Sequence, residues 1–364
     1  MMEKLSIKPQ FRRMVEVMTD DIGIVQHSDL DIPIKRDRNS YPYSIDDVAR
    51  ALVVVSRFSS LFPHLDSKDK HRTYLNFIKR AMRPDGFFYN YQDLRGEPIK
   101  EPQIEEDCFS RVMWALSEVQ SSDLPARFRE ETRDIFEERL PLIGKLSSLN
   151  SQALALIALE KYLGKKTTNY NKDLVYGIVK HLADELSGSL DRNSENGWTW
   201  FSDKMTYDNA RLPQALLMAS EILDDERLLM QGKKSLDFLI KQSFRSSNGN
   251  NHDGVFYGIG NDGWFTKTDF LQGKKPPIYD QQTIEAGAMV EACVDASRIL
   301  VNNNYKVFYA RNVFGWFRGV NVSKNNVLAE NGGVYDAITE NSVNKNQGAE
   351  SLVGYLLAAS KMLN

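Results

Sequence analysis

Six helix starts of one style recur along the chain, and each opens a stretch that is apolar on nearly every side. They lie at residues 43–52, 106–116, 150–154, 207–216, 282–286 and 347–351. Three of them carry an acid followed by an arginine, as in Asp46-Asp47-Val48-Ala49-Arg50. A helix that is apolar all round must be enclosed by other parts of the protein. These helices therefore constrain the fold more than any other feature.

A second kind of helix alternates with the first and is amphipathic and charged. These helices are expected at residues 68–82, 127–140, 172–186, 226–244 and 305–317, with 11–18 as a sixth. Six enclosed helices ringed by six amphipathic ones predict an all-α, closed (α/α)6 toroid, because a ring leaves no exposed apolar end face. Short β segments at 86–91 and 254–258 are assigned to loops on one face. No linker is apparent, so a single domain over residues 1–364 is predicted.

Composition and charge exclude several classes of function. The chain has 364 residues, a net charge of −3 and no block of like charges, so no nucleic-acid partner is expected. No apolar run reaches membrane-spanning length and no signal sequence is apparent, which favours a soluble, cytoplasmic protein with no membrane partner. Cys108 and Cys293 lie in apolar helical contexts and are interpreted as buried thiols. No spacing suits a metal site, and no cofactor motif is found.

Long loops enter the enclosed helices and are rich in aromatic, glycine and acidic residues. In a ring of helical hairpins the inner helices point the same way, so these loops share one face. Trp198, Trp200 and Trp264 lie in them. Aromatic faces beside amide and carboxylate groups suit the CH-rich face and hydroxyl rim of a sugar ring. The alternative is that these aromatic residues only close the loops over the core.

The acids at the helix starts have two interpretations. An Asp at a helix N-terminus is commonly a cap, and the following arginine fits a structural ion pair, as in Asp107 with Arg111 or Asp208 with Arg211. Carboxylates that converge on one cavity would instead raise each other's pKa, while a nearby arginine keeps one of them charged. Sugar hydrolysis uses such an acid and base pair.

Several motifs together resemble one family. They lie at residues 19–27, 43–52, 106–116, 198–201, 207–217, 280–286 and 346–351, and they span nearly the whole chain. The chain resembles bacterial six-hairpin, glycosidase-like proteins, which are often labelled as glycosyltransferases or fused behind a glycosyltransferase domain. It departs from that pattern at Ser202 and Val48, where Glu and Asn are expected. The resemblance implies an (α/α)6 barrel and carbohydrate chemistry, with a possible functional link to glycosyltransferases.

We therefore predict a metal-independent, inverting glycoside hydrolase that acts on a short oligosaccharide. The acid and base are expected among Asp47, Asp107, Asp208 and Glu285, with Glu350 in reserve. Glu285 is the candidate acid, and Asp47 is a candidate base or substrate anchor. The predicted substrate-binding residues are Tyr43, Asp46, Arg50, Arg111, Trp198, Trp200, Tyr207, Arg211, Trp264, Gln281, Gln282, His27, His252 and Glu350.

Two other functions fit the same sequence. A sugar epimerase or isomerase needs a base with a pKa near neutrality, often histidine. His27 and His252 are the candidates for that role, whereas His64, His71 and His181 are expected at the surface. A non-catalytic glycan-binding protein would keep the aromatic residues without a carboxylate pair at hydrolytic distance.

Overall fold

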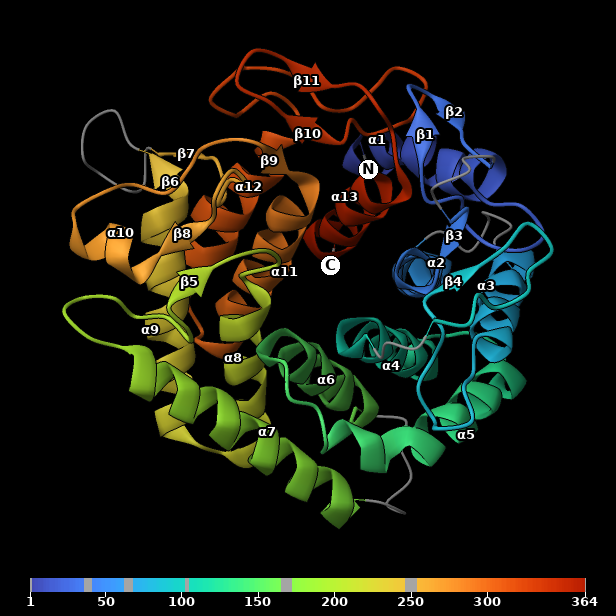
Figure 1. Cartoon of the computed structure of the whole chain (residues 1–364), viewed down its shortest axis with the longest axis horizontal. Helices are drawn as coiled ribbons and strands as arrows, with labels where there is room; N and C mark the ends of the chain where they lie inside the picture. The colour runs from blue at the N-terminus through green and yellow to red at the C-terminus, as the bar shows by residue number, and fades with distance from the viewer. Residues whose placement is uncertain are drawn as a thin grey trace.

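The helices lie in two concentric rings (Figure 1) in the computed structural model, which describes residues 2–35, 41–61, 68–101, 105–164, 172–245 and 254–363. The inner ring contains α2 (Ile45–Leu61), α4 (Glu106–Ser121), α6 (Leu149–Tyr162), α8 (Arg211–Leu223), α11 (Thr283–Ile299) and α13 (Ala349–Leu363). Each inner helix contacts the next, and α13 contacts α2, so the ring closes. The predicted all-α (α/α)6 toroid is confirmed.

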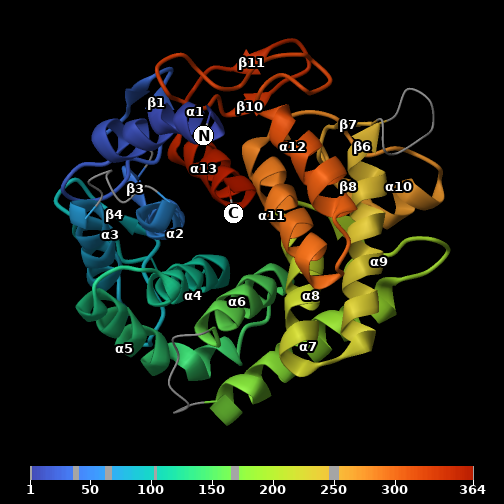
Figure 2. The same ribbon diagram turned by 180° about the vertical axis from the view of Figure 1, so that it is seen from behind.

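The outer ring covers the inner one, as Figure 2 shows from behind. It contains α3 (Lys68–Arg80), α5 (Ala126–Ile143), α7 (Lys172–Asn193), α9 (Glu226–Ser243), and η4 (Tyr305–Ala310) continued by α12 (Arg311–Trp316). The N-terminal segment, α1 (Met2–Arg12) continued by η1 (Arg13–Met18), packs against α13 and completes this ring. This helical segment begins earlier than the predicted 11–18. No helix in the described ranges is both long and apolar enough to cross a membrane.

The two rings differ in how their residues are buried. All residues of α6 from Ser151 to Leu159 are buried, as a helix enclosed on every side requires. By contrast, α7 buries Val175, Ile178 and Leu182 along one stripe and exposes Lys180 on the other side. The alternation read from the sequence therefore corresponds to position in the ring.

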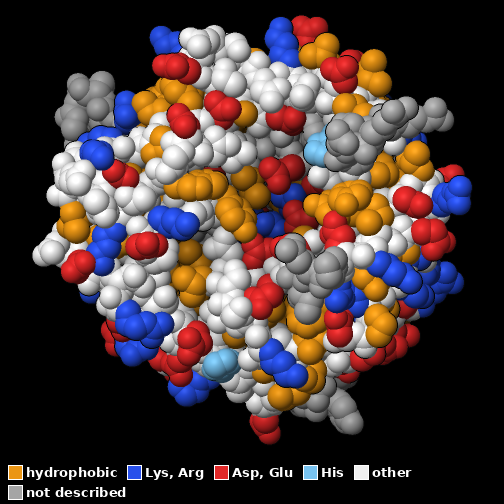
Figure 3. All heavy atoms as spheres, in the orientation of Figure 1, with side chains coloured by type: hydrophobic (Ala, Val, Ile, Leu, Met, Phe, Trp, Pro, Cys, Tyr) orange, Lys and Arg blue, Asp and Glu red, His pale blue; other side chains and the backbone are white. Residues whose placement is uncertain are grey.

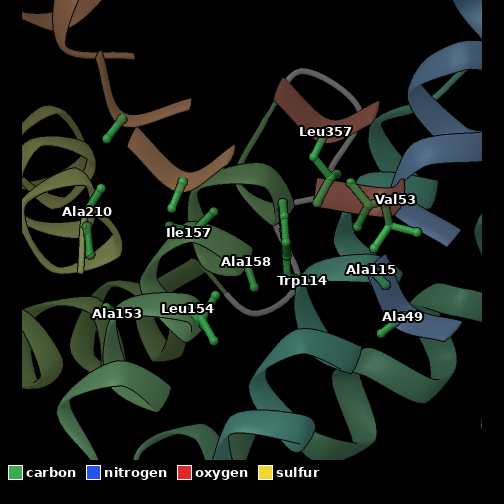
Figure 4. Close-up of a cluster of buried hydrophobic side chains, with 14 of the residues drawn as sticks. Ala49, Val53, Trp114, Ala115, Ala153, Leu154, Ile157, Ala158, Ala210 and Leu357 are labelled. Atoms are coloured by element: carbon green, nitrogen blue, oxygen red, sulfur yellow. The ribbon is translucent and has the colours of Figure 1, made fainter. Parts of the chain in front are cut away.

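Small and large apolar side chains interlock between the inner helices (Figure 4). Ala49, Trp114, Leu154 and Leu357 come from four different helices and are each at most 2% exposed. Burial of a side chain the size of leucine contributes roughly 1.5–3 kcal/mol. The alanines keep adjacent backbones close, which allows six helices to share one core.

Short antiparallel strands lie in the loops, and some of them directly precede inner helices. The strands are β1 (Ser28–Asp29), β2 (Ile32–Pro33), β3 (Tyr43–Ser44), β4 (Tyr91–Gln92), β5 (Lys204–Met205), β6 (Phe244–Arg245), β7 (Val255–Phe256), β8 (Phe265–Thr266), β9 (Gln281–Gln282), β10 (Ala337–Ile338) and β11 (Val343–Asn344). A short helix, α10 (Lys267–Leu271), follows β8. Strand β3 leads directly into α2 and pairs with β4, and β9 leads into α11 and pairs with β10. Short strands in the loops are thus confirmed, although only Tyr91 of the predicted segment 86–91 and Val255–Phe256 of 254–258 lie in strands.

Candidate active site

A cavity of about 490 Å³ opens at the end of the toroid where the inner helices begin. Its lining residues are Gln26, His27, Ser44, Asp46, Asp47, Arg50, Asn90, Tyr91, Cys108, Asn261, Asp280, Gln282, Asp336, Ala337, Asn344, Gly348, Glu350 and Ser351. Figure 3 shows acidic side chains gathered around a hollow near the centre of this face. This is the face on which the sequence places the site.

Two other cavities lie elsewhere. One of about 470 Å³ is lined by residues from the opposite ends of the inner helices, among them Arg57, Glu118, Asp295 and Lys361. These charges pair with one another, since Arg57 Nη2 lies 2.5 Å from Glu118 Oε1 and Lys361 Nζ lies 2.7 Å from Asp295 Oδ1. The other, of about 620 Å³, lies beside η4 and α12. Neither of these two cavities is lined by the loops that line the first cavity.

The first turn of α2 presents two consecutive carboxylates to the cavity at the helix start. Nη2 of Arg50, one turn further on, lies 2.7 Å from Asp46 Oδ2 and 2.9 Å from Asp47 Oδ1. The same nitrogen lies 3.2 Å from Oε2 of Glu350, at the start of α13. One guanidinium thus gathers three carboxylates from two inner helices.

Asp46 and Asp47 differ in burial and in partners. The side chain of Asp46 is 21% exposed, and Arg111 Nε lies 2.6 Å from its Oδ1. The side chain of Asp47 is 5% exposed and has Arg50 as its guanidinium partner. Burial raises the pKa of Asp47 to about 7, against the opposing effect of Arg50 and with the help of the neighbouring charges of Asp46 and Glu350. Two adjacent carboxyl groups therefore have different surroundings, and burial favours the protonated form of Asp47.

Asp208 lies behind this pair and does not line the cavity. Its two oxygens face Arg111 Nη1 at 3.1 Å and Arg211 Nε at 3.2 Å, and the residue is 2% exposed. Arg211 continues to Glu291, with Nη2 2.6 Å from Oε2. For Asp208 and Arg211 the ion-pair interpretation is the one that the geometry supports, because neither side chain lines the cavity.

Asp107 and Glu285 also lie outside the cavity lining. Asp107 accepts hydrogen bonds from Ser151 and from Tyr207, whose side chain is part-exposed. Glu285 accepts a hydrogen bond of 3.0 Å from Asn209 Nδ2. Burial raises the pKa of Glu285 to about 7, as expected for a candidate acid, although hydrogen bonds from Asn209 oppose the effect. These two carboxyl groups occupy the same face, beside the cavity.

The predicted aromatic subsites need correction. Trp198 and Trp200 are each 1% exposed, so a sugar ring has no access to their faces. Trp198 instead packs against Phe238, Phe265 and Phe270 with ring centroids 5.4 to 5.8 Å apart. Loop aromatics close over one another here, which is the alternative left open by the sequence.

Tyr43 and Gln281 are likewise buried, and both hold loops in place. The Tyr43 hydroxyl donates to Asp20 Oδ2 at 2.6 Å, and Gln281 Oε1 accepts a hydrogen bond of 2.7 Å from Trp316 Nε1. Trp264 is only partly buried but does not line the cavity.

The histidines and cysteines are only partly where the sequence places them. His27 lines the cavity, whereas His64 and His252 fall outside the described residues. His181 is exposed as expected, but His71 is buried against the core. Cys293 is buried, while Cys108 is half-buried and lines the cavity, where burial raises the pKa of its thiol.

Several lining residues are not among those predicted for the site, although Gln26 and Asp280 lie within the motifs at 19–27 and 280–286. They are Gln26, Asn90, Asn261, Asp280, Asp336 and Asn344, all in loops or short strands. Asn90 is 9% exposed, and its Oδ1 has no hydrogen-bond partner in the described part of the protein. A buried acceptor beside a cavity suits a hydroxyl group of a ligand. No group of three acidic, histidine or cysteine side chains within the described ranges is placed to share a metal ion.

Comparison with known proteins identifies the fold. No model of a known protein family matches the sequence, and no curated protein does. A D-mannose isomerase structure matches with a TM-score of 0.70 and 14% identity over 100% of this chain and 97% of that chain. A cellobiose 2-epimerase from Spirochaeta thermophila matches with a TM-score of 0.67 and 12% identity over 100% and 97%.

A hydrolase shares the same architecture. A family 76 α-mannanase from Bacteroides thetaiotaomicron matches with a TM-score of 0.63 and 11% identity over 99% of this chain and 94% of that chain. At these identities the matches establish the six-hairpin glycosidase-like fold over the whole chain. The acidic cavity lies where such a toroid gathers the starts of its inner helices.

Proposed function

We propose that the protein is a carbohydrate-active enzyme, a glycoside hydrolase in which Asp46 and Asp47 are the catalytic carboxyl groups. One observation carries the proposal: both line the same cavity, and their surroundings differ. Hydrolysis of a glycosidic bond requires one carboxyl group that holds a proton and one that is charged. The fold shared with sugar-processing enzymes is consistent with this chemistry.

Asp47 takes the role of general acid. With a pKa of about 7, a substantial fraction of its carboxyl groups carry a proton at neutral pH. Asp46 takes the role of the charged carboxylate, because the guanidinium groups of Arg50 and Arg111 both stabilise its negative charge. This division replaces the wider set of acids expected from the sequence, in which Glu285 was the candidate acid.

The spacing of the pair favours retention of anomeric configuration. Asp46 Oδ2 and Asp47 Oδ1 both contact Nη2 of Arg50, so they cannot be farther apart than the sum of those two distances, 2.7 and 2.9 Å. That limit is below the separation of about 6.5–9.5 Å in inverting enzymes, and it admits the value of about 5–5.5 Å in retaining ones. Retention therefore replaces inversion in this proposal.

The reaction then has two steps. Asp47 gives its proton to the glycosidic oxygen as the C1–O bond breaks, and Asp46 forms a bond to C1, which leaves a glycosyl ester. Asp47 next takes a proton from water, the water oxygen bonds to C1, and the ester bond to Asp46 breaks. The enzyme returns to its starting state, with one water consumed.

A sugar epimerase or isomerase is the second candidate, because two of the matching folds belong to such enzymes. His27 is the one histidine among the described residues that lines the cavity. That chemistry would use His27 as the base that removes a proton from carbon. It would change the configuration or carbonyl position of the sugar and leave the glycosidic bond intact.

Incubation with manno-, gluco- and galacto-oligosaccharides, followed by chromatography of the products, tests the proposal. We expect shorter sugars from the native enzyme and a loss of at least about 10³-fold in Asp46→Asn and Asp47→Asn, since each removes an essential group. Asp184→Asn, on an exposed part of α7, is the control and should keep full activity. Epimerised sugars of unchanged length, or binding without product, would overturn the proposal.

A further inference from the structure

When two neighbouring carboxyl groups share a cavity, an interaction made by only one of them determines which group keeps the proton. Arg50 does not favour the charged form of either group over the other, because its Nη2 contacts Asp46 at 2.7 Å and Asp47 at 2.9 Å. Glu350 does not favour one of the two groups either, since it contacts the same guanidinium group of Arg50. Arg111 is different: it contacts Asp46, with Nε 2.6 Å from Oδ1, and is not among the groups in contact with Asp47.

We propose that Arg111 is the positioning residue that assigns the negative charge to Asp46 and so leaves the proton on Asp47. The inference rests on the proposed function of this pair. Arg111 comes from α4, the neighbour of α2 in the ring, and approaches Asp46 from the side opposite to α13. An opposite charge in contact with one member of a carboxyl pair stabilises the charged form of that member.

Arg111 is itself fixed by a row of buried ion pairs that crosses the ring. Its Nη1 lies 3.1 Å from Asp208 Oδ2, and Asp208 Oδ1 lies 3.2 Å from Arg211 Nε. The row continues through Glu291 to Arg57, with contacts of 2.6 and 2.5 Å. Burial alone would raise the pKa of Glu291, but Arg211 and Arg57 lower it to about 2, so the row stays charged.

The backbone at Asp208 supports the same role. Asp208 has a φ of 51°, in the left-handed region that residues other than glycine seldom adopt. Two guanidinium groups hold its carboxylate from different helices, which compensates for that conformation. Arg111 therefore cannot turn toward Asp47 without leaving Asp208 with a single partner.

The other charged or titratable groups facing Asp46 do not distinguish the pair. They are Arg50, Asp47 and Glu350 at the cavity, and Cys108 and Tyr91 beside it. Burial raises the pKa values of Cys108 and Tyr91, so both are uncharged at neutral pH. Among these charged groups, Arg111 is the one that contacts Asp46 alone, and its effect adds to that of the deeper burial of Asp47.

The pH profile of kcat/KM in Arg111→Gln and Arg111→Lys tests this role. In Arg111→Gln the acid limb should move to higher pH, because the charged form of the carboxyl pair loses an adjacent positive charge. The alkaline limb, which reports Asp47, should move less. Arg111→Lys keeps the charge and should restore most of the acid limb. A fall in kcat with an unmoved acid limb would mean that Arg111 is only structural.

Titration of ¹³C-labelled Asp carboxyl groups by NMR separates this inference from the proposed function. The signals of the carboxyl pair, assigned with Asp46→Asn and Asp47→Asn, should begin to titrate at higher pH in Arg111→Gln even if the protein hydrolyses no sugar. Hydrolysis with an unmoved titration of the pair would overturn the role of Arg111 and leave the function intact. Asp208 keeps Arg211 in this variant, which favours folding. If it does not fold, Arg111→Gln with Asp208→Asn should show the same shift.

Discussion

Arg50 on the first inner helix reaches Glu350 on the last, with Nη2 3.2 Å from Oε2. The pair joins α2 to α13, where the ring closes, and it lies at the cavity. The same guanidinium also holds the two candidate catalytic carboxylates. One buried side chain thus takes part both in the contact that closes the toroid and in the assembly of the site.

Arg50→Gln should destabilise the protein by about 3–5 kcal/mol, because it leaves the buried carboxyl group of Asp47 without its guanidinium partner. Urea unfolding followed by circular dichroism measures this loss. Lys180→Ala is the control, since its ion pair with Asp184 is exposed to solvent and should contribute less than about 0.5 kcal/mol. Equal effects of the two substitutions would contradict the importance assigned to Arg50.

Asp47 should make stability depend on pH in a defined direction. Its pKa is raised from 3.8 to about 7 in the folded protein. Its contribution to stability is therefore fully present below about pH 4 and is lost as the pH rises through 7. Asp47→Asn should remove this dependence and, relative to the native protein, gain on the order of 3 kcal/mol between pH 4 and pH 8.

Urea unfolding of both proteins at several pH values measures the Asp47 effect. Asp184→Asn, at an exposed position of α7, provides a matched change of Asp to Asn away from the cavity and should leave the pH dependence as it is in the native protein. A native protein that gains stability relative to Asp47→Asn as the pH rises would show that Asp47 is charged in the fold.

Asn90→Ala should weaken substrate binding without unfolding the protein. Asn90 lines the cavity and its buried Oδ1 has no partner among the described residues, so we expect this oxygen to accept a sugar hydroxyl. Loss of one such hydrogen bond corresponds to a rise in KM of about 3- to 12-fold. Asn304→Ala, at an exposed position before η4, is the control and should leave KM unchanged. An unchanged KM in Asn90→Ala would remove Asn90 from the binding site.

Two glycines should respond to alanine in opposite ways. A Cβ at Gly287 of α11 would lie 2.9 Å from the carbonyl oxygen of Gly354 in α13, so Gly287→Ala should cost about 1–3 kcal/mol. A Cβ at Gly177 of α7 meets nothing within 4 Å, so Gly177→Ala should stabilise the helix by about 0.5–1 kcal/mol. Thermal unfolding of both variants measures the difference. A stabilising Gly287→Ala would contradict the close packing of α11 against α13.

The architecture was predictable because the inner helices are apolar on all sides and the outer ones are not. That difference predicts which helices lie inside the ring and which cover them before any contact is known, as for α6 inside and α7 outside. The face of the site followed from the shared direction of the inner helices. The division of the chain into one domain stays a prediction from the absence of a linker.

Only part of the cavity lining could be predicted from the helix starts, which supply residues such as Asp46 and Glu350. Asp47 and Asp208 occupy similar places in the sequence, but Asp208 is turned between Arg111 and Arg211 while Asp47 faces the cavity. The local sequence does not determine whether such an Asp side chain faces the cavity or pairs with arginines from other helices. Asp336 arrives from the loop before α13 and has no pattern that marks it.

The prediction that aromatic residues in the loops bind sugar failed for a different reason. Trp198 sits among polar and glycine residues, as a sugar platform would, yet it packs against Phe238 and Phe265 from other segments. Partners distant in sequence decide whether an aromatic ring is open or covered. Only the folded chain contains that information.

The most direct test of the central claim is to trap the glycosyl ester on the enzyme. An activated 2-deoxy-2-fluoro glycoside of the sugar identified by the oligosaccharide screen slows both steps and lets the ester accumulate. Mass spectrometry of the intact protein and of its peptides should then show one added glycosyl group, located at Asp46. An adduct at another residue, or none in an enzyme that turns over the parent sugar, would contradict the assignment of Asp46 and Asp47 as the catalytic pair.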